Sequence, residues 1–331
     1  MQPFDYVRAG STQSAIKGAG AIDGTAFIAG GTDLMQLMKE GAAAPRHLID
    51  INGLPFTEIR ALPEGLRLGA LARMADVADD PGVRRHFPAV AEALLASASA
   101  QVRNAATIGG NLLQRTRCTY FRDPAMPCNK RAPGTGCSAI GGDHRLHAIL
   151  GTSDHCIATH PSDLAVALVA LDAVVEVQGE GGLRRIPADE LHRLPGDAPQ
   201  RDTVLEPGDL IVAVEVPGSA AARRSCYLKV RDRASFEFAL VSVAAGLEIE
   251  DGVVRVARLA AGGVGTKPWR LRAAEAALAG KPAAPASFEL AADAIEAARP
   301  LPMNAFKVEL LRRAVRRALL TAAGQAAGEM S

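Results

Sequence analysis

A long irregular segment rich in cysteine lies near the middle of this 331-residue chain, from about residue 115 to residue 160. Four of the five cysteines fall there, between positions 118 and 156, among many glycines, prolines, arginines and histidines. The density of proline and glycine predicts a segment without regular helices or strands. Because a loop of this length inside a compact domain is usually functional, the regular elements have to be organised around it.

The clustered cysteines indicate a metal centre more than disulfides. The N-terminus lacks a basic stretch followed by an apolar run, and no apolar stretch is long enough for a membrane span. By its own sequence the chain is therefore expected in the cytoplasm, or in the periplasm if a signal-bearing partner carries it out. Clustered thiols in a reducing compartment more often bind metal than pair. The candidate ligands are Cys118, Cys128, Cys137 and Cys156.

The spacing of these cysteines leaves two kinds of metal centre open. No Cys-x-x-Cys pair is present, which disfavours zinc without excluding it, whereas a [4Fe–4S] cluster tolerates looser spacing. Nearby basic side chains could offset the charge of a four-thiolate cluster, and nearby histidines are either further ligands or hydrogen-bonding loop residues. Cys226, in an alternating run, is expected to be a buried apolar residue. The basic residues are Arg115, Arg117, Arg122, Lys130, Arg131 and Arg145, and the histidines are His144, His147, His155 and His160.

Two glycine bends are candidate sites for a phosphate-bearing cofactor. Glycines let the backbone approach an anion closely, and free N–H groups at a helix start attract it. The first bend joins an expected strand over residues 25–29 to an expected helix over residues 33–39. Either bend alone could also be a tight turn without a ligand. The first comprises Ala26, Phe27, Ile28, Ala29, Gly30, Gly31, Thr32, Asp33 and Leu34, and the second Thr107, Ile108, Gly109, Gly110 and Asn111.

Two charged residues further along the chain each have two interpretations. A helix over residues 162–170 is expected, which either Ser162 or Asp163 could cap. If Asp163 is not the cap, it could accept hydrogen bonds from cofactor hydroxyls. Lys229 lies in an alternating strand over residues 225–230. It is either a solvated strand lysine or a cation at the edge of an electron-rich ring.

Composition and length limit the remaining possibilities. A net charge of +1 and 4% aromatic residues do not indicate binding to nucleic acid or to a membrane surface.

The length of the chain suits about two domains. Beyond residue 224, three antiparallel strands over 225–230, 238–249 and 253–261 are expected, the last two joined by an Asp251–Gly252 turn. Helices over 271–278, 288–298 and 305–323 are expected to follow. Hydrolase and Walker motifs are absent.

Six stretches spread along the chain, taken together, resemble the medium, FAD-binding subunit of the xanthine dehydrogenase and carbon monoxide dehydrogenase family, along essentially the full length. Most members lack the cysteine insert. An insert with all four cysteines is similar to the periplasmic aldehyde oxidoreductase branch, where the flavin subunit of a three-subunit enzyme carries a [4Fe–4S] cluster, and to the flavin subunit of 4-hydroxybenzoyl-CoA reductase. The supporting stretches are residues 4–8, 28–34, 68–71, 106–111, 160–168 and 261–268.

The resemblance implies an α+β fold in two domains. Residues 1–219 would form a two-lobed FAD-binding domain of the p-cresol methylhydroxylase type, carrying the cysteine loop. Residues 220–331 would form the family's C-terminal domain, a three-stranded antiparallel sheet with helices. By the same resemblance the two glycine bends would hold the FAD pyrophosphate and Asp163 a cofactor hydroxyl. Ile211 would pack beside the flavin and Lys229 would lie at its polar edge.

The function implied by the resemblance is electron transfer. A large subunit with molybdopterin would oxidise an aldehyde, and a small subunit with [2Fe–2S] clusters would pass the electrons to FAD in this chain and on to an external acceptor. Two other functions stay open from the residues: a metal-stapled structural subunit with empty glycine bends, and a stand-alone flavin oxidase.

Overall fold

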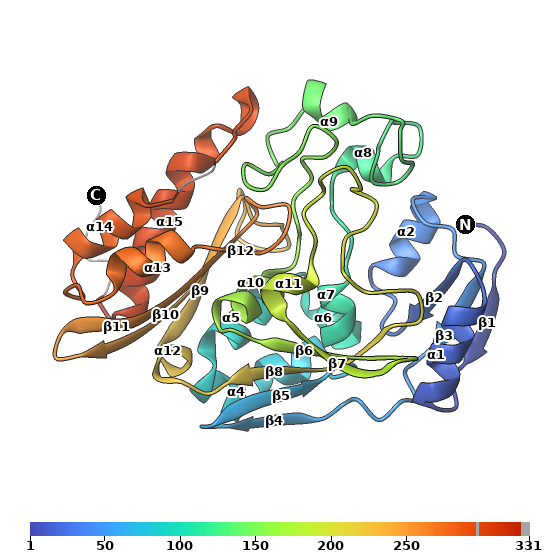
Figure 1. The fold of residues 1–331 in the computed structure, drawn as a ribbon, viewed down its shortest axis with the longest axis horizontal. Coiled ribbons are helices and arrows are strands. Elements are labelled where there is room, and N and C mark those ends of the chain that lie inside the picture. Colours follow the sequence, from blue (N-terminus) through green and yellow to red (C-terminus); the bar gives the residue numbers. More distant parts are fainter. Residues whose placement is uncertain (296–297, 326–331) are drawn as a thin grey trace.

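The computed structural model describes residues 1–295 and 298–325. Three sheets, each with its own helices, surround a central region, and the cysteine segment covers one end of it (Figure 1). This arrangement confirms the expected α+β class. Within residues 1–295 and 298–325, no helix is long and apolar enough to cross a bilayer.

The first sheet is small and parallel, with strand order β1-β3-β2. The sequence predicts its strand and helix around the first glycine bend to within one residue, and Gly41, with φ 76°, ends the helix in the left-handed conformation. The elements are β1 (Asp5–Arg8), α1 (Thr12–Ala21), β2 (Thr25–Ile28), α2 (Leu34–Glu40) and β3 (His47–Asp50).

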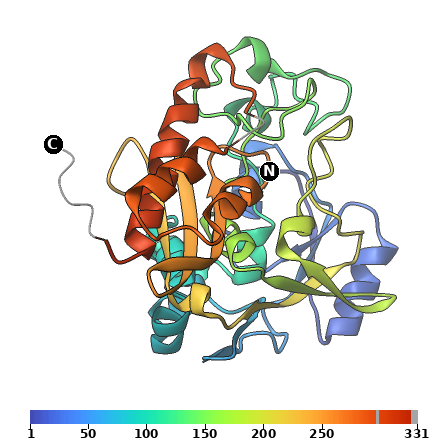
Figure 2. The ribbon, with the colours of Figure 1, turned by 60° about the vertical axis from the view of Figure 1, so that its left-hand side comes forward.

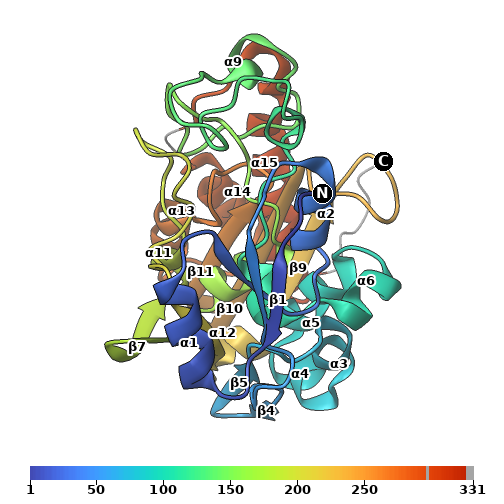
Figure 3. The same ribbon diagram turned by 90° about the vertical axis from the view of Figure 1, so that its right-hand side faces the viewer.

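The second sheet is antiparallel, with strand order β4-β5-β8-β6-β7. Most of its helices lie on one face (Figures 1 and 3), and we call this sheet with its helices the second lobe. The strands are β4 (Ile59–Leu62), β5 (Gly65–Gly69), β6 (Val174–Gly179), β7 (Gly182–Pro187) and β8 (Leu210–Pro217). The helices are α3 (Met74–Asp79), α4 (Pro81–His86), α5 (Pro88–Ala96), α6 (Ala100–Ala105), α7 (Ile108–Leu112), α10 (Asp163–Ala170) and α11 (Ala188–Leu191).

The third sheet has four antiparallel strands, so the expectation of three strands is wrong. The fourth, β12, pairs only two residues with the edge of β11, and a strand this short shows no alternation in the sequence. The expected Asp251–Gly252 turn is present, with φ of 50° and 74°. The strands are β9 (Ser225–Val230), β10 (Val241–Glu250), β11 (Val253–Gly262) and β12 (Trp269–Arg270). The helices are α12 (Ala220–Arg223), α13 (Arg272–Leu278), α14 (Pro285–Asp293), a 3-10 turn (Pro302–Asn304) and α15 (Phe306–Ala322); residues 296–297 of the expected helix 288–298 lie outside the described residues.

Both faces of the third sheet are buried. The first seven residues of strand β10 are all buried. The helices α5 and α10 cover one face of the sheet, and α13, α14 and α15 cover the other. A strand buried on both faces reads as a continuous apolar run. Every residue of α10 is buried as well, because this helix contacts β10 and β11 of the third sheet and the helices α5, α7 and α11 beside the second sheet. Cys226 is buried under α15, as expected, and its Sγ lies 3.3 Å from the Ala318 carbonyl oxygen.

The cysteine segment is mostly irregular, but it contains two single-turn helices that the sequence did not predict. These are α8 (Thr119–Arg122) and α9 (Ser138–Gly141). Each begins directly after a cysteine, at Cys118 and at Cys137. The start of α15, from the C-terminal part of the chain, lies against this segment in both Figure 1 and Figure 2. The segment is therefore held by elements from both ends of the chain.

Candidate functional site

One cavity of about 1030 Å³ lies between the first sheet, the helices of the second lobe and the β9–β10 loop. Its volume is at the upper end of the range of about 300–1,000 Å³ usual for ligand pockets. The structure brings almost every predicted cofactor residue to its wall. Those lining it are Ala26 to Leu34, Thr107, Gly109, Gly110, Asn111, Asp163, Ile211 and Lys229. Ile108 is the exception, since its side chain is fully buried in the core of the second lobe.

The first bend needs glycine for two separate reasons. A Cβ at Gly30 would lie 2.0 Å from the carbonyl oxygen of Ala105, and Gly31 has φ +68°. Across the described chain, no protein acceptor is bonded to the backbone amides of residues 30–32. Unpaired N–H groups on a cavity wall suit an anionic ligand.

The second bend differs, because its amides are already bonded inside the protein. Ile108 N and Gly109 N donate to the carbonyls of Ala72 and Ala70, and Gly110 N donates to the Thr107 hydroxyl at 3.3 Å. Asn111 is also engaged, since its Oδ1 accepts from Ser162 Oγ at 2.6 Å. The second bend therefore forms a wall of the cavity and offers few free donors.

Asp163 does not cap its helix, because Ser162 does so by accepting from Ala165 N at 3.0 Å. The Asp163 carboxylate instead accepts from Lys229 Nζ at 2.7 Å and from Tyr227 OH at 2.5 Å. The Lys229 and Asp163 side chains are only 3% and 6% exposed, so Lys229 is not a solvated strand lysine. The pair forms a buried charged group on the cavity wall.

Two members of this group were missed in the sequence. Ser97 Oγ lies 3.0 Å from Asp163 Oδ2, and Tyr227 is two residues before Lys229 on β9. Residues i and i+2 of a strand share one face, so the alternation could have placed Tyr227 beside Lys229. Burial, followed by the Asp163 charge, raises the pKa of Tyr227 well above its usual value and keeps the hydroxyl protonated as a donor.

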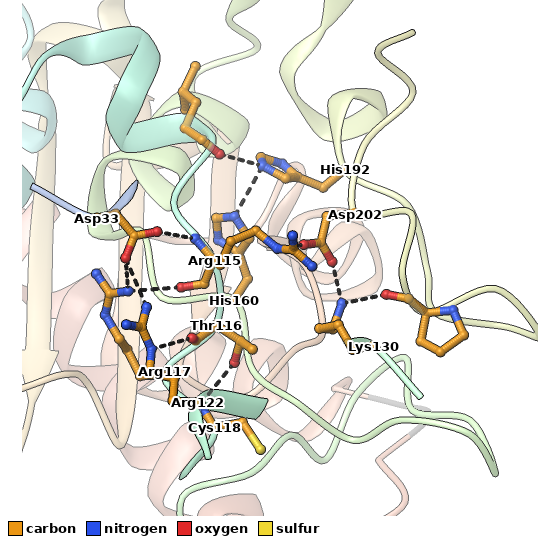
Figure 4. Close-up of polar contacts among 12 residues, drawn as sticks. Asp33, Arg115, Thr116, Arg117, Cys118, Arg122, Lys130, His160, His192 and Asp202 are labelled. Carbon is orange, nitrogen blue, oxygen red and sulfur yellow. Dashed lines mark hydrogen bonds and ion pairs between the residues drawn. The ribbon is translucent and has the colours of Figure 1, made fainter. Parts of the chain in front are cut away.

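Asp33 links the first bend to the cysteine segment (Figure 4). Its carboxylate accepts from the Arg115 backbone N at 2.7 Å and from Arg122 Nη2 at 2.8 Å, and it pairs with Arg117. Burial acts to raise the pKa of Asp33, but the Arg117 charge and these hydrogen bonds outweigh it and lower the pKa. Asp33 thus uses its charge to hold the segment on both sides of Cys118.

Replacing Asp33 by alanine should loosen the cysteine segment. It leaves Arg117 and Arg122, which are only 24% and 12% exposed, without this carboxylate, so we expect a loss of about 3 kcal/mol in unfolding free energy. Limited proteolysis should then cut within residues 115–160. As a control, Glu206→Gln breaks the exposed ion pair with Arg201 and should change the cleavage pattern little. Equal resistance of Asp33→Ala and wild type would contradict this role.

All four cysteines of the segment line a second, small cavity of about 10 Å³. Cys118 also lines the large cavity, so it lies on the wall between the two. Cys128 and Cys137 face each other in an isolated antiparallel bridge. Burial raises the pKa of the Cys118 thiol to about 12. Among the described residues, no three His, Cys, Asp or Glu side chains meet around a point that could hold a single metal ion.

The basic residues of the segment are mostly used in holding it together. Lys130 and Arg115 both pair with Asp202, which no sequence signal identified (Figure 4). Arg131 donates to the carbonyls of Tyr120 and Phe121 at 2.8 and 2.7 Å. Their positive charge therefore stays close to the thiols but is fixed by protein partners.

The segment ends at a buried pair of histidines (Figure 4). His160 Nε2 lies 3.0 Å from His192 Nε2, which also lies 2.9 Å from the Leu112 carbonyl oxygen. Burial lowers the pKa of both rings, so both are neutral near pH 7. His160 therefore packs as a buried hydrogen-bonding residue, and His192 is a partner that the sequence did not reveal.

Two family models match most of the chain. The FAD binding domain in molybdopterin dehydrogenase matches residues 2–219, and the CO dehydrogenase flavoprotein C-terminal domain matches residues 226–322.

Known proteins are similar along nearly the whole chain. The aldehyde oxidoreductase FAD-binding subunit PaoB of Escherichia coli is 48% identical over 328 residues, which is 98% of this chain and 100% of that protein. The glyceraldehyde dehydrogenase medium chain of Sulfolobus acidocaldarius is 28% identical and covers 84% of this chain and 82% of its own length. Carbon monoxide dehydrogenase from Hydrogenophaga pseudoflava has a solved chain with TM-score 0.75 and 26% identity, covering 98% of this chain and 99% of that one.

Proposed function

Since the chain belongs to the FAD-binding subunits of the molybdenum hydroxylases, a family of oxidoreductases, we propose that it is the flavin and iron–sulfur electron-transfer subunit of an aldehyde oxidoreductase complex. The 48% identical relative is named as a subunit of an aldehyde oxidoreductase, and it spans the same length. The observation that carries the proposal is Cys118, which lies on the wall shared by the large cavity and the thiol cavity.

The large cavity fits FAD by its volume and by its free donors. The amides of Gly30, Gly31 and Thr32 would hold the diphosphate, because they lack protein acceptors within the described chain. Thr107, Gly109, Gly110 and Asn111 would shape the opposite wall, and Ile211 would pack beside the ring system. Asp163 would accept from a cofactor hydroxyl, and Lys229 would place its charge at the polar edge of the ring. FAD supplies acceptance of two electrons and their release one at a time.

The four thiols fit a [4Fe–4S] cluster by their chemistry and number. Cys118, Cys128, Cys137 and Cys156 reach one cavity from well-separated points of a wrapping loop, as a four-thiolate cluster requires. A cavity of about 10 Å³ has room for about one water, so binding a cluster would move the thiols apart. Nearby positive charge on Lys130 and Arg115 would offset the thiolates.

The other subunits of the complex would carry out the substrate chemistry. We propose a large subunit with molybdopterin and a small subunit with [2Fe–2S] clusters, from which electrons enter this chain and leave to an external acceptor. We also place the boundary between the FAD-binding and C-terminal parts near residues 219–220. The domain and subunit relations follow those of the family that the chain belongs to.

Cofactor and activity analysis tests this proposal against a structural subunit and a stand-alone oxidase. The purified complex should contain about one flavin and about four irons and four sulfides assignable to this chain. The isolated chain, loaded with flavin, should not oxidise an aldehyde, whereas the complex should. A preparation without flavin would favour a structural role, and aldehyde turnover by the isolated chain would favour the oxidase. Zinc in place of iron would remove the cluster from the proposal.

A further inference from the structure

A contact between Cys118 and His147 lies between the two proposed cofactors. His147 Nε2 is 3.1 Å from the Cys118 sulfur. Both residues line the large cavity, and Cys118 also lines the thiol cavity. The imidazole therefore stands beside one thiol on the wall that separates the two cavities.

The direction of this hydrogen bond follows from the chemistry of a metal ligand. A cysteine that binds a cluster does so as a thiolate, whose sulfur has no proton and can only accept. The imidazole must then carry its proton on Nε2. His147 Nδ1 is buried and has no hydrogen-bond partner among the described residues, so no other contact sets this tautomer.

A buried lysine lies next to His147. Lys307, at the start of α15, is fully buried and donates from Nζ to the carbonyls of His147 at 3.1 Å, Leu146 at 3.0 Å and Gly263 at 2.8 Å. All three partners are neutral, and burial lowers the pKa of Lys307 to about 7, so the side chain is only partly protonated near neutral pH.

We propose that His147 tunes the [4Fe–4S] cluster by donating its Nε2–H to the Cys118 ligand. Donors to cluster sulfurs and nearby positive charge stabilise the more negative, reduced form, so they raise the reduction potential. The inference rests on the proposed function, because it requires the cluster. It assigns to this chain a residue that sets how readily the cluster exchanges electrons with the flavin cavity beside it.

Redox titration of the complete complex, followed by EPR of the reduced cluster, tests this proposal. His147→Leu removes the donor and should lower the ratio of reduced to oxidised cluster at a fixed potential by about tenfold, which is about 59 mV for a one-electron couple. His147→Gln keeps an N–H donor at the same number of bonds from the backbone and should stay near the wild-type value. Iron, sulfide and flavin contents are measured in each variant.

The outcomes separate this inference from the proposed function. Equal potentials in wild type and His147→Leu, with equal iron content, would overturn the tuning role and leave the cluster in place. A wild-type complex without iron and sulfide would overturn the cluster itself. If His147→Leu fails to retain the cluster, wild-type complex labelled with ¹⁵N-histidine should show a histidine nitrogen coupled to the reduced cluster, and its absence would overturn the hydrogen bond.

Discussion

Replacing Gly30 by alanine should abolish flavin retention and destabilise the part of the protein built around the first sheet. The added Cβ would lie 2.0 Å from the Ala105 carbonyl oxygen, which is backbone and cannot rotate away. The bend would have to shift, which moves the free amides of residues 30–32. We expect flavin occupancy below about a tenth of wild type and a loss of about 3 kcal/mol in unfolding free energy, at the upper end for overpacking.

Released flavin, quantified by absorbance per protein, and thermal unfolding check this expectation. Gly53→Ala is the matched control, because a Cβ at Gly53 meets no atom within 4 Å. That control should bind flavin and unfold like wild type. Normal flavin content in Gly30→Ala would show that the first bend does not hold the cofactor.

Replacing Asp163 by leucine should have a comparably large effect on stability. The change leaves the Lys229 ammonium buried without its carboxylate and removes the acceptor of the Tyr227 hydroxyl. Breaking one side of a buried ion pair costs about 3–5 kcal/mol. Denaturant unfolding of Asp163→Leu against wild type measures this loss. Glu309→Gln, which breaks the exposed pair with Arg313 on α15, should cost no more than about 0.5 kcal/mol.

A double variant separates the two roles of the pair. Asp163→Leu with Lys229→Met removes both charges and should recover most of the stability, since apolar replacement of a whole buried pair is often neutral. Flavin retention should remain low in the double variant, because both proposed cofactor contacts are gone. Recovery of flavin together with stability would show that the pair is structural only.

The parts of the fold with strong local signals were predictable. The strand and helix around Gly30 and Gly31 are found within one residue, because a strand, a glycine pair and an apolar helix period follow in order. The Asp251–Gly252 turn is likewise fixed by residues that tolerate positive φ. The two-residue strand β12 and the single-turn helices after Cys118 and Cys137 were not predictable, since they are too short to show a period.

The sequence predicted which residues form the site better than it predicted which hydrogen bonds those residues make. Almost all expected residues line one cavity. Both glycine bends were expected to hold the cofactor, yet Ile108, Gly109 and Gly110 of the second bend already donate their amides inside the protein. It also left Asp163 as a possible helix cap, and Ser162 takes that role. Partners such as Asp202, His192 and Lys307 come from distant parts of the chain, where no local pattern records the contact.

The anchors of the cysteine segment have a consequence for the order of events during synthesis. Asp202, Asp232, Asn304 and Lys307 all follow the segment in the chain and bond to it in the folded protein. At about 5–20 residues per second, the ribosome needs roughly 7–29 s to pass from His160 to Lys307. The thiols thus leave the ribosome well before the last helix that fastens their loop, so loading of the proposed cluster would follow completion of the polypeptide.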